Sequence, residues 1–505
     1  MSGEEDDMAE QQLATGTPQA GEAAPLDEFR ALLKREFRPR DEEAEERIDA
    51  AVRTLAEQAL ANTRLIGDDA LKSIQALIAA LDRKLTEQIN LILHHPEFQA
   101  LEGAWRGLWH LVNNTETDQM LKIRVLNITK QEMSRTLEAF EGTAWDQSPI
   151  FKKIYTEEYS MFGGEPFGCL VGDYYFDNHP KDVALLGNLA NICAAAHTPF
   201  IAGAAPSLFG MESWQELMNP RDLTKIQSTP DYAKWQSLRK AEDSRYIGLA
   251  MPRVLARLPY GAKTSPVEAF AFEEDVRGTD HHKYCWMNAA YAMAVNITRS
   301  FKMYGWCTRI RGVESGGAVT NLPVHTFPTD DGGVAMKCPT EIAIDDRREK
   351  ELADLGLMPI LHRKNTDIAA FIGAQSLQKP DVYDDPDATA NANLSARLPY
   401  LFAVCRFAHY LKAIVRDKIG SFKERSDMEK WLNRWILNYV DGNPDFSSEE
   451  TKAKKPLRAA EVRVQEVEGN PGYYNAQFYL RPHYQLEGVN VSLRLVSKLP
   501  SVKGV

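Results

Sequence analysis

The last hundred residues constrain the fold most, because two helical patterns there lead into three segments of alternating polarity. Apolar residues recur every three or four positions over 401–419 and again over 431–439, the spacing of helices with one buried face. The period-two segments that follow begin at Val462, Tyr474 and Val489. Alternation of this kind predicts half-buried strands, and the glycine-containing turns between them predict an antiparallel meander.

The third of these segments ends only a few residues before the chain does. A strand at a chain end can be an exposed edge whose backbone groups accept a strand from another chain. The pattern is equally compatible with a meander that closes within its own domain. Both interpretations stay open on the pattern alone.

The 505 residues are enough for two or three domains with a substantial core. The formal net charge is −12, and the first fifty residues contribute −9 of it through 15 acidic and 6 basic residues. The remainder is nearly neutral, so no basic face points to nucleic acid. The acidic start is not a signal peptide and no unbroken apolar run reaches 18 residues, so we expect a cytoplasmic protein without membrane insertion.

The six cysteines are scattered, mostly in apolar surroundings, and none forms a CxxC motif. We expect small buried residues in a reducing compartment.

The N-terminal region combines a tail with a short helical island. Residues 1–25 carry no periodic apolar pattern and are expected to be disordered. Residues 26–37 place apolar side chains on a helical face, and a helix this short is marginal alone in water. The island therefore fits either a partner's groove or the surface of its own domain.

The most regular helical pattern follows. Its apolar positions, spaced by threes and fours as in a heptad seam, are Leu71, Ile74, Ile78, Leu81, Leu85 and Ile92. Such a seam must pack against another helix, in this chain or in a partner. A second amphipathic helix is predicted from Phe98 to Val112, around Gly103 and Gly107.

From Ser148 onward helix and strand patterns alternate, which favours an α/β middle domain. Strands are predicted at 167–172, 198–204, 357–361 and 368–374, and an apolar helix at 284–301. Two further strands are predicted at 122–128 and 341–344, from alternation and β-branched content. The fold class is α/β (α+β overall), with a helical N-terminal region and C-terminal antiparallel strands.

Catalytic and metal-binding patterns are weak. The sequence has no P-loop, GxGxxG, GxSxG, HExxH or EF-hand motif. His281, His282 and Cys285 could ligate zinc but lack a fourth ligand. Asp173, Asp177 and His179 follow a predicted strand without a nucleophile, which favours helix capping. We therefore expect no catalytic residue, no metal and no cofactor.

Three stretches resemble a known family. They are the segment HPEFQALEGAWRGL at 95–108, the segment FGMESW at 209–214, and the region from Asn443 to Leu495. They closely resemble the large subunit of the type VI secretion contractile sheath, the TssC/VipB family. Residues 355–360 also look like a strand of phage tail sheaths. The resemblance runs from about residue 71 to residue 499.

The resemblance implies a structural role. Large subunits of this family pair with a small sheath subunit (TssB/VipA) and stack as a helical polymer around an inner tube of Hcp, on a baseplate. The extended sheath shortens and drives the inner tube outward, and the hexameric AAA+ unfoldase ClpV then takes it apart by gripping an N-terminal helix. The alternatives are a phage-tail-like sheath of another injection device and an α/β enzyme with an unrecognised site.

Four groups of residues receive expected roles under the resemblance. The unfoldase-binding helix is expected at Leu26, Phe29, Leu32, Leu33 and Phe37. Packing against the small subunit is expected at Leu71, Ile74, Ile78, Leu81 and Leu85. Intersubunit strands are expected at Val462, Val464, Val489, Val491, Leu493 and Leu495. Contact with the inner tube is expected at Arg416, Lys418, Lys423 and Arg425.

The expected domains follow the same logic. Residues 1–25 form an acidic tail and 26–66 an N-terminal helical segment. Residues 67–150 together with 380–505 form the sheath core, and 151–379 form the α/β middle domain.

Overall fold

A computed structural model of the chain describes residues 70–219, 221–418, 425–466 and 474–483, together with 43, 46, 47, 50 and 54. It divides into two compact units, one of residues 1–90 with 268–272 and another of 91–267 with 273–505. The acidic tail, the helical island at 26–37 and the predicted strand at 489–495 lie outside the described residues. The heptad pattern is confirmed as one long helix, α3 (Ala70–Leu93).

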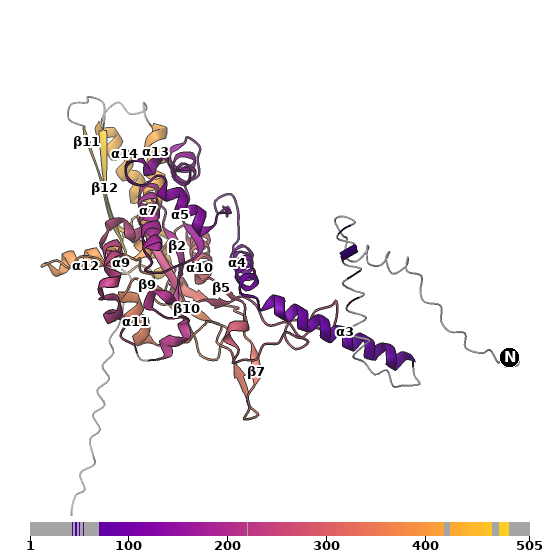
Figure 1. The fold of residues 1–505 in the computed structure, drawn as a ribbon. Coiled ribbons are helices and arrows are strands. Elements are labelled where there is room, and N and C mark those ends of the chain that lie inside the picture. Colours follow the sequence, from indigo (N-terminus) through magenta and orange to yellow (C-terminus); the bar gives the residue numbers. More distant parts are fainter. Residues whose placement is uncertain are drawn as a thin grey trace, which may run out of the picture. The chain divides into compact units, whose positions relative to one another are not determined.

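A six-stranded mixed sheet forms the centre of the larger unit (Figure 1). Its order is β1 (Leu170–Phe176), β2 (Phe200–Ala204), β3 (Ile247–Met251), β9 (Leu357–His362), β10 (Ala369–Phe371) and β6 (Ala318–Val319). The first four strands are parallel and the last two add in antiparallel register. Strands β2 and β3 are buried throughout, as expected for a parallel sheet covered on both faces.

Alternate residues of β2 belong to different cores, so the sheet has a helical layer on each side. Phe200 and Ala202 pack with helix α7 (Pro180–Ala196), whereas Ile201 packs with α10 (Ala289–Tyr304) and the start of α13 (Leu398–Lys418). This three-layer arrangement confirms the predicted α/β middle region and its apolar helix.

The remaining elements cover this sheet or extend from it. The helices are α4 (Pro96–Asn113), α5 (Lys130–Glu138), α6 (Pro149–Phe151), α8 (Leu223–Gln227), α9 (Ala233–Lys240), α11 (Asp346–Asp354), α12 (Pro386–Ser395), α14 (Arg425–Leu437) and α15 (Glu449–Lys454). Two short antiparallel pairs stand apart from the main sheet, β4 (Val254–Leu255) with β5 (Trp286–Met287), and β7 (Thr326–Pro328) with β8 (Val334–Met336).

Two predicted strands are wrong. Residues 122–128 lead from a bend into α5 without joining any sheet of the described chain, and Lys122 and Arg124 pair with Glu165 and Glu158. At 341–344 the Glu341 side chain is held by Arg253, so the segment leads into α11 without forming a ladder. Residues 122–128 have no partner strand among the described residues, and the segment at 341–344 reaches β4 only through a single bridge between Thr340 and Val254.

The C-terminal hairpin has a core of its own. β11 (Leu457–Glu466) pairs antiparallel with β12 (Tyr474–Pro482), and both lie beside α13 and α14 (Figure 1). Trp306 stacks on Phe407 with ring centroids 4.3 Å apart, which ties this core to the end of α10. Two of the three predicted meander strands are therefore present.

Helix α13 contains a 20-residue stretch that is apolar and long enough to cross a membrane by composition alone. More than half of its most apolar stretch is buried against the protein, and Leu398, Phe402 and Phe407 are almost inaccessible. The apolar character of this helix is accounted for by core packing.

Within the larger unit, helix α4 packs closely against β5 and α10 through two glycines. A Cβ atom at Gly103 would lie 2.4 Å from the carbonyl oxygen of Trp286, and one at Gly107 would lie 2.3 Å from Cδ2 of Tyr291. Both distances are far below van der Waals contact. The two glycines, one helical turn apart, therefore set how closely the helix backbone approaches β5 and α10.

We predict that Gly103→Ala destabilises the protein. In a solvent-exposed helix, replacing glycine by alanine stabilises the protein by about 1 kcal/mol. At Gly103 the new methyl group would overlap the backbone carbonyl of Trp286, and overpacking of this kind costs about 1–3 kcal/mol of stability. Thermal unfolding of the variant checks this. Trp105→Ala on the opposite face of α4 is the matched control and should unfold within about 0.5 kcal/mol of the parent. An unchanged or raised stability for Gly103→Ala would contradict the packing.

A buried histidine links α13 to the end of α7. His409 Nε2 donates to the carbonyl oxygen of Ala196 at 2.9 Å, and the ring lies edge-on to Tyr159. Nδ1 is buried and has no hydrogen-bond partner within the described residues. Burial lowers the pKa of His409 to about 4, with Arg406, His197 and Lys412 adding repulsion.

We predict an acid-dependent loss of stability from His409. The unfolded chain takes up a proton near pH 6.5 whereas the folded chain resists it to about pH 4, so stability is full above pH 6.5 and falls as the pH drops toward 4. The loss is about 3 kcal/mol. In denaturant unfolding between pH 7 and 4.5, His409→Gln should show a flatter profile than the parent, while exposed His95→Gln should match the parent. Parallel profiles for His409→Gln and the parent would contradict the assignment.

Candidate assembly interface

The outward face of α4 is an exposed apolar stripe. Its members, spaced by about one helical turn, are Leu101 (56% exposed), Trp105 (66%), Trp109 (62%) and Val112 (49%). Single exposed apolar residues are ordinary, but two tryptophans in a continuous stripe are typical of a binding surface. We call these four residues the α4 stripe.

An ionic network fixes the rotation of α4. Arg257 bridges Glu102 on the helix and Glu274 on a loop, with N–O distances of 2.6 Å to each. Burial acts to lower the pKa of Arg257, but its hydrogen bonds to Glu102 and Glu274 outweigh that and raise it. The same helix bonds Tyr260 through Arg106 Nη2 at 2.7 Å. Because the glycine face of α4 is packed and the charged side chains of Glu102 and Arg106 are bonded to the rest of the unit, the helix cannot rotate to bury the α4 stripe.

The seam of α3 is partly open. Ile78 is 52% exposed, and Leu81 and Leu85 are half-buried. The side chains of Leu71 and Ile74 are not among those described. The helix is confirmed, and its packing partner stays a prediction.

The outer side of β11 is closed by side chains of α14. Asn433 Oδ1 accepts from the backbone N–H of Val462 at 3.0 Å, and Asn433 Nδ2 donates to the carbonyl oxygen of Val462 at 2.8 Å. Glu429 Oε2 accepts from the N–H of Val464 at 2.9 Å. The Asn433 amide thus takes the place that a peptide group of a neighbouring strand would occupy. The Val462 and Val464 side chains are buried in the hairpin core.

The outer side of β12 is different. The N–H and C=O groups of Val462 point away from β12, toward Asn433. Phe478 lies directly opposite Val462 in the antiparallel pair, so the N–H and C=O groups of Phe478 point away from β11. No further strand pairs with β12 within the part of the chain that the structure describes. Gln477 and Tyr479 face solvent between these positions. Within the described residues, the backbone groups of this hairpin that point outward without a partner strand are therefore those of β12.

Of the residues expected to contact an inner tube, Arg416 has hydrogen-bond partners within the chain. Arg416 Nη1 donates to the carbonyl oxygens of Ser160 and Met161 at 3.3 and 2.9 Å, so part of its guanidinium is committed within the chain. Lys423 and the side chains of Lys418 and Arg425 lie outside the described residues. Their contact with an inner tube stays a prediction.

Groups that look catalytic in the sequence have structural partners. Asp177 accepts from the N–H of His179 and from the hydroxyl of Ser207, both at 2.8 Å, and His179 caps α7. His281 is buried against Glu341 whereas His282 is exposed, so the two imidazoles do not converge with Cys285. The described residues contain no group of three or more potential metal ligands.

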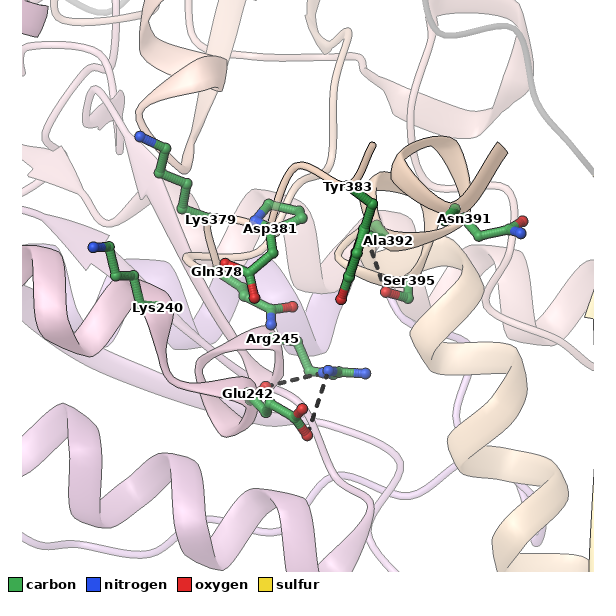
Figure 2. Close-up of a pocket in the computed structure, with 12 residues that line it drawn as sticks. Lys240, Glu242, Arg245, Gln378, Lys379, Asp381, Tyr383, Asn391, Ala392 and Ser395 are labelled. Atoms are coloured by element: carbon green, nitrogen blue, oxygen red, sulfur yellow. Dashed lines mark hydrogen bonds and ion pairs between the residues drawn. The ribbon is translucent and has the colours of Figure 1, made fainter. Parts of the chain in front are cut away.

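One shallow pocket lies between the end of α9 and α12 (Figure 2). Its polar rim carries Lys240, Lys379 and Asp381, and the Arg245 Nε donates to the carbonyl oxygen of Glu242 at 2.9 Å. Among the lining residues there is no histidine or cysteine, and the hydroxyl of Ser395 donates to a helix carbonyl. The arrangement offers no nucleophile with an adjacent base.

Sequence reasoning missed which face of α4 is buried and missed Asn433 entirely. The four-residue spacing of Gly103 and Gly107 was a usable indication of close backbone packing on that face. Asn433 had no local indication, because its role depends on a strand about thirty residues away.

The comparisons agree on a family. Two models of the EvpB/VC_A0108 tail sheath match the chain, the N-terminal domain at residues 75–378 and the gpW/gp25-like domain at 387–499. The type VI secretion system sheath protein TssC1 of Pseudomonas aeruginosa strain PAO1 is 72% identical over 476 residues, covering 94% of this chain and 96% of that protein.

Two solved structures are weakly similar. The anti-feeding prophage baseplate gives a TM-score of 0.39 at 12% identity, covering 75% of this chain and 83% of that chain. The contracted helical sheath of the same prophage gives a TM-score of 0.30 at 14% identity, covering 63% of this chain and 67% of that chain. Likeness at this level is too weak to argue from.

The family models cover most of the chain, and the identity to a curated sheath protein extends over nearly its whole length. The expected resemblance is confirmed, and the chain belongs to the EvpB/VC_A0108 tail sheath family.

Proposed function

We propose that this chain is the large subunit of a type VI secretion contractile sheath. It assembles with a small sheath subunit into a helical tube, and contraction of that tube propels an inner tube of Hcp. The observation that carries the proposal is 72% identity, over 94% of the chain, to a type VI secretion system sheath protein. The α4 stripe and the β12 edge support it, since a subunit that functions only in a polymer needs surfaces of both kinds.

The α4 stripe is proposed to pack against a helix of the small subunit, and the seam of α3 is separately proposed to pack against the small subunit. Its apolar positions recur at helical spacing, and ridges of this kind accept the side chains of a second helix. The close packing of the glycine face holds the α4 backbone in place, so little backbone conformational entropy is lost when a partner binds the stripe. Tryptophans at the centre of such a contact usually contribute most of its free energy.

The β12 edge is proposed to accept a strand from a neighbouring subunit. Residues 489–495, with Val489, Val491, Leu493 and Leu495 on one face, are the proposed donor. Strand exchange keeps subunits connected by backbone hydrogen bonds while the linkers between strand and domain flex. Val462 and Val464 on β11 support this sheet from within the hairpin core, since Asn433 and Glu429 occupy that strand's outer backbone groups.

The energy for contraction is proposed to reside in the assembly, as a difference in interface free energy between two packings of the same subunits. No nucleotide or catalytic site is needed for this, and the protein is proposed to act without enzymatic activity in the bacterial cytoplasm. The division into a sheath core (67–150 with 380–505) and a middle domain (151–379) remains part of the proposal.

Further partners are proposed from the family resemblance. The helix at 26–37 is proposed to bind the ClpV unfoldase after contraction, and the assembled tube is proposed to sit on a baseplate. Arg416, Lys418, Lys423 and Arg425 are proposed to face the inner tube.

We predict that Trp105→Ala with Trp109→Ala weakens binding of the small subunit. Losing two central aromatic contacts should cost at least about 2 kcal/mol, or roughly thirtyfold in affinity. Co-purification of full-length chain with tagged small subunit, followed by titration, measures this. Phe446→Ala, which removes a still more exposed aromatic outside α4, is the control and should bind as the parent does. Parental binding by the double variant would rule the α4 stripe out.

We predict that Leu493→Pro abolishes tube formation without preventing small-subunit binding. Proline removes a backbone donor and fixes φ, so the segment cannot add to a sheet edge. Negative-stain microscopy of the co-expressed subunits should show striated tubes for the parent and for Leu493→Ile, and none for Leu493→Pro. Tubes from Leu493→Pro would refute strand donation, whereas an absence of tubes from the parent would refute the proposed function itself.

A further inference from the structure

The backbone of residues 122–127 has no hydrogen-bond partner within the part of the chain that the structure describes. No N–H or C=O group of this segment bonds to another of the described residues, and the segment joins no sheet there. Two of its apolar side chains are open to solvent, Val125 (68% exposed) and Leu126 (56%). Free backbone groups beside exposed apolar side chains are the features that an added strand recognises.

Hydrogen bonds fix the chain just before and just after this segment. The Asp118 carboxylate accepts from the backbone N–H groups of Met120 and Leu121, at 2.7 and 2.9 Å. The carbonyl oxygen of Ile128 accepts from the hydroxyl of Tyr174, on β1, at 2.6 Å. A partner strand would therefore meet a segment whose two ends are already held in place, so little conformational entropy would be lost on pairing.

The charged side chains of the segment are neutralised within the chain. Lys122 and Arg124 alternate along it and both pair with Glu165, and Arg124 pairs also with Glu158. Two positive and two negative charges leave this face without a net charge. Because the other exposed side chains here are apolar, the segment matches a mainly apolar strand better than a strongly charged one.

The segment is continuous with the α4 stripe. Ile123 and Leu108 pack against the same buried apolar cluster, which contains Leu111 of α4. Val112, the last member of the stripe, directly follows Leu111. A partner that covers the stripe as far as its end would therefore reach the backbone of residues 122–127.

We propose that residues 122–127 accept a mainly apolar strand of the small subunit, paired backbone to backbone, while a helix of the same subunit packs on the α4 stripe. This inference rests on the proposed function and adds a second contact to it. Six extended residues span about 20 Å, enough for a partner strand of similar length. The strand-like alternation of residues 122–128, which forms no ladder inside the described chain, is then completed between chains.

Backbone amide hydrogen exchange, read by mass spectrometry, tests the pairing. The full-length chain is measured alone, in complex with the small subunit as the Leu493→Pro variant, which is expected not to form tubes, and in tubes of the parent. Residues 122–127 should exchange freely in the isolated chain and at least about tenfold more slowly in both assemblies.

Every other exchange pattern overturns the proposal. Protection already present in the isolated chain would mean that the chain covers the segment itself. Protection found only in tubes would assign the added strand to a second copy, such as its residues 489–495. Free exchange within tubes would refute the added strand while leaving the proposed function intact, whereas an absence of tubes from the parent would refute that function instead.

Proline variants separate backbone pairing from a side-chain contact. Consecutive N–H groups of an extended segment point to opposite edges, so Val125→Pro and Leu126→Pro remove donors from different edges. In titrations with the small subunit, one of them should bind about tenfold more weakly than its matched control, Val125→Ala or Leu126→Ala, which keeps the N–H. Thermal unfolding should show that all four variants are folded, because the described chain has no ladder here to lose. Equal binding within both pairs would overturn the proposal, and the exchange measurement on the parent decides it if a proline variant fails to fold.

Discussion

The contact of Gly103 and Gly107 with Trp286 and Tyr291 fixes the orientation of α4, and with it the exposure of the α4 stripe. Because Gly103 and Gly107 have no Cβ atoms, the α4 backbone packs directly against β5 and α10, and the glycine face of the helix is buried. The buried pairing of Arg257 with Glu102 and Glu274 then resists rotation, because turning the helix would separate buried charges from their partners. The consequence is that apolar side chains, which would normally turn inward, are held in solvent at a fixed geometry.

The C-terminal hairpin presents a surface of a different kind. On β11 the side-chain amide of Asn433 satisfies an edge that would otherwise recruit a strand, and on β12 the equivalent backbone groups point away from the hairpin. The α4 stripe is a rigid apolar surface, whereas the outer edge of β12 is a row of backbone groups. A sheath subunit is expected to need both, since a rigid contact can define a heterodimer while exchanged strands keep neighbouring subunits connected as they move.

Much of this fold could be predicted from the sequence, and the failures have physical causes. The apolar runs of β2 and β9 and the helix α10 were predictable because buried parallel strands and core helices need uninterrupted hydrophobicity. The strand predicted at 122–128 was wrong because alternation does not reveal whether a partner strand is in register. The outward direction of the α4 stripe was not predictable from periodicity, which finds an apolar face and assumes that the face is buried within the chain.

The most direct test of the central claim is hydroxyl-radical footprinting of Trp105 and Trp109, read by mass spectrometry in the isolated chain and in tubes assembled with the small subunit. The account predicts that both indole rings are readily oxidised in the isolated chain and strongly protected in the tubes, while exposed Phe446 provides an internal reference. Protection of the two tryptophans already in the isolated chain, or full oxidation within assembled tubes, would contradict it.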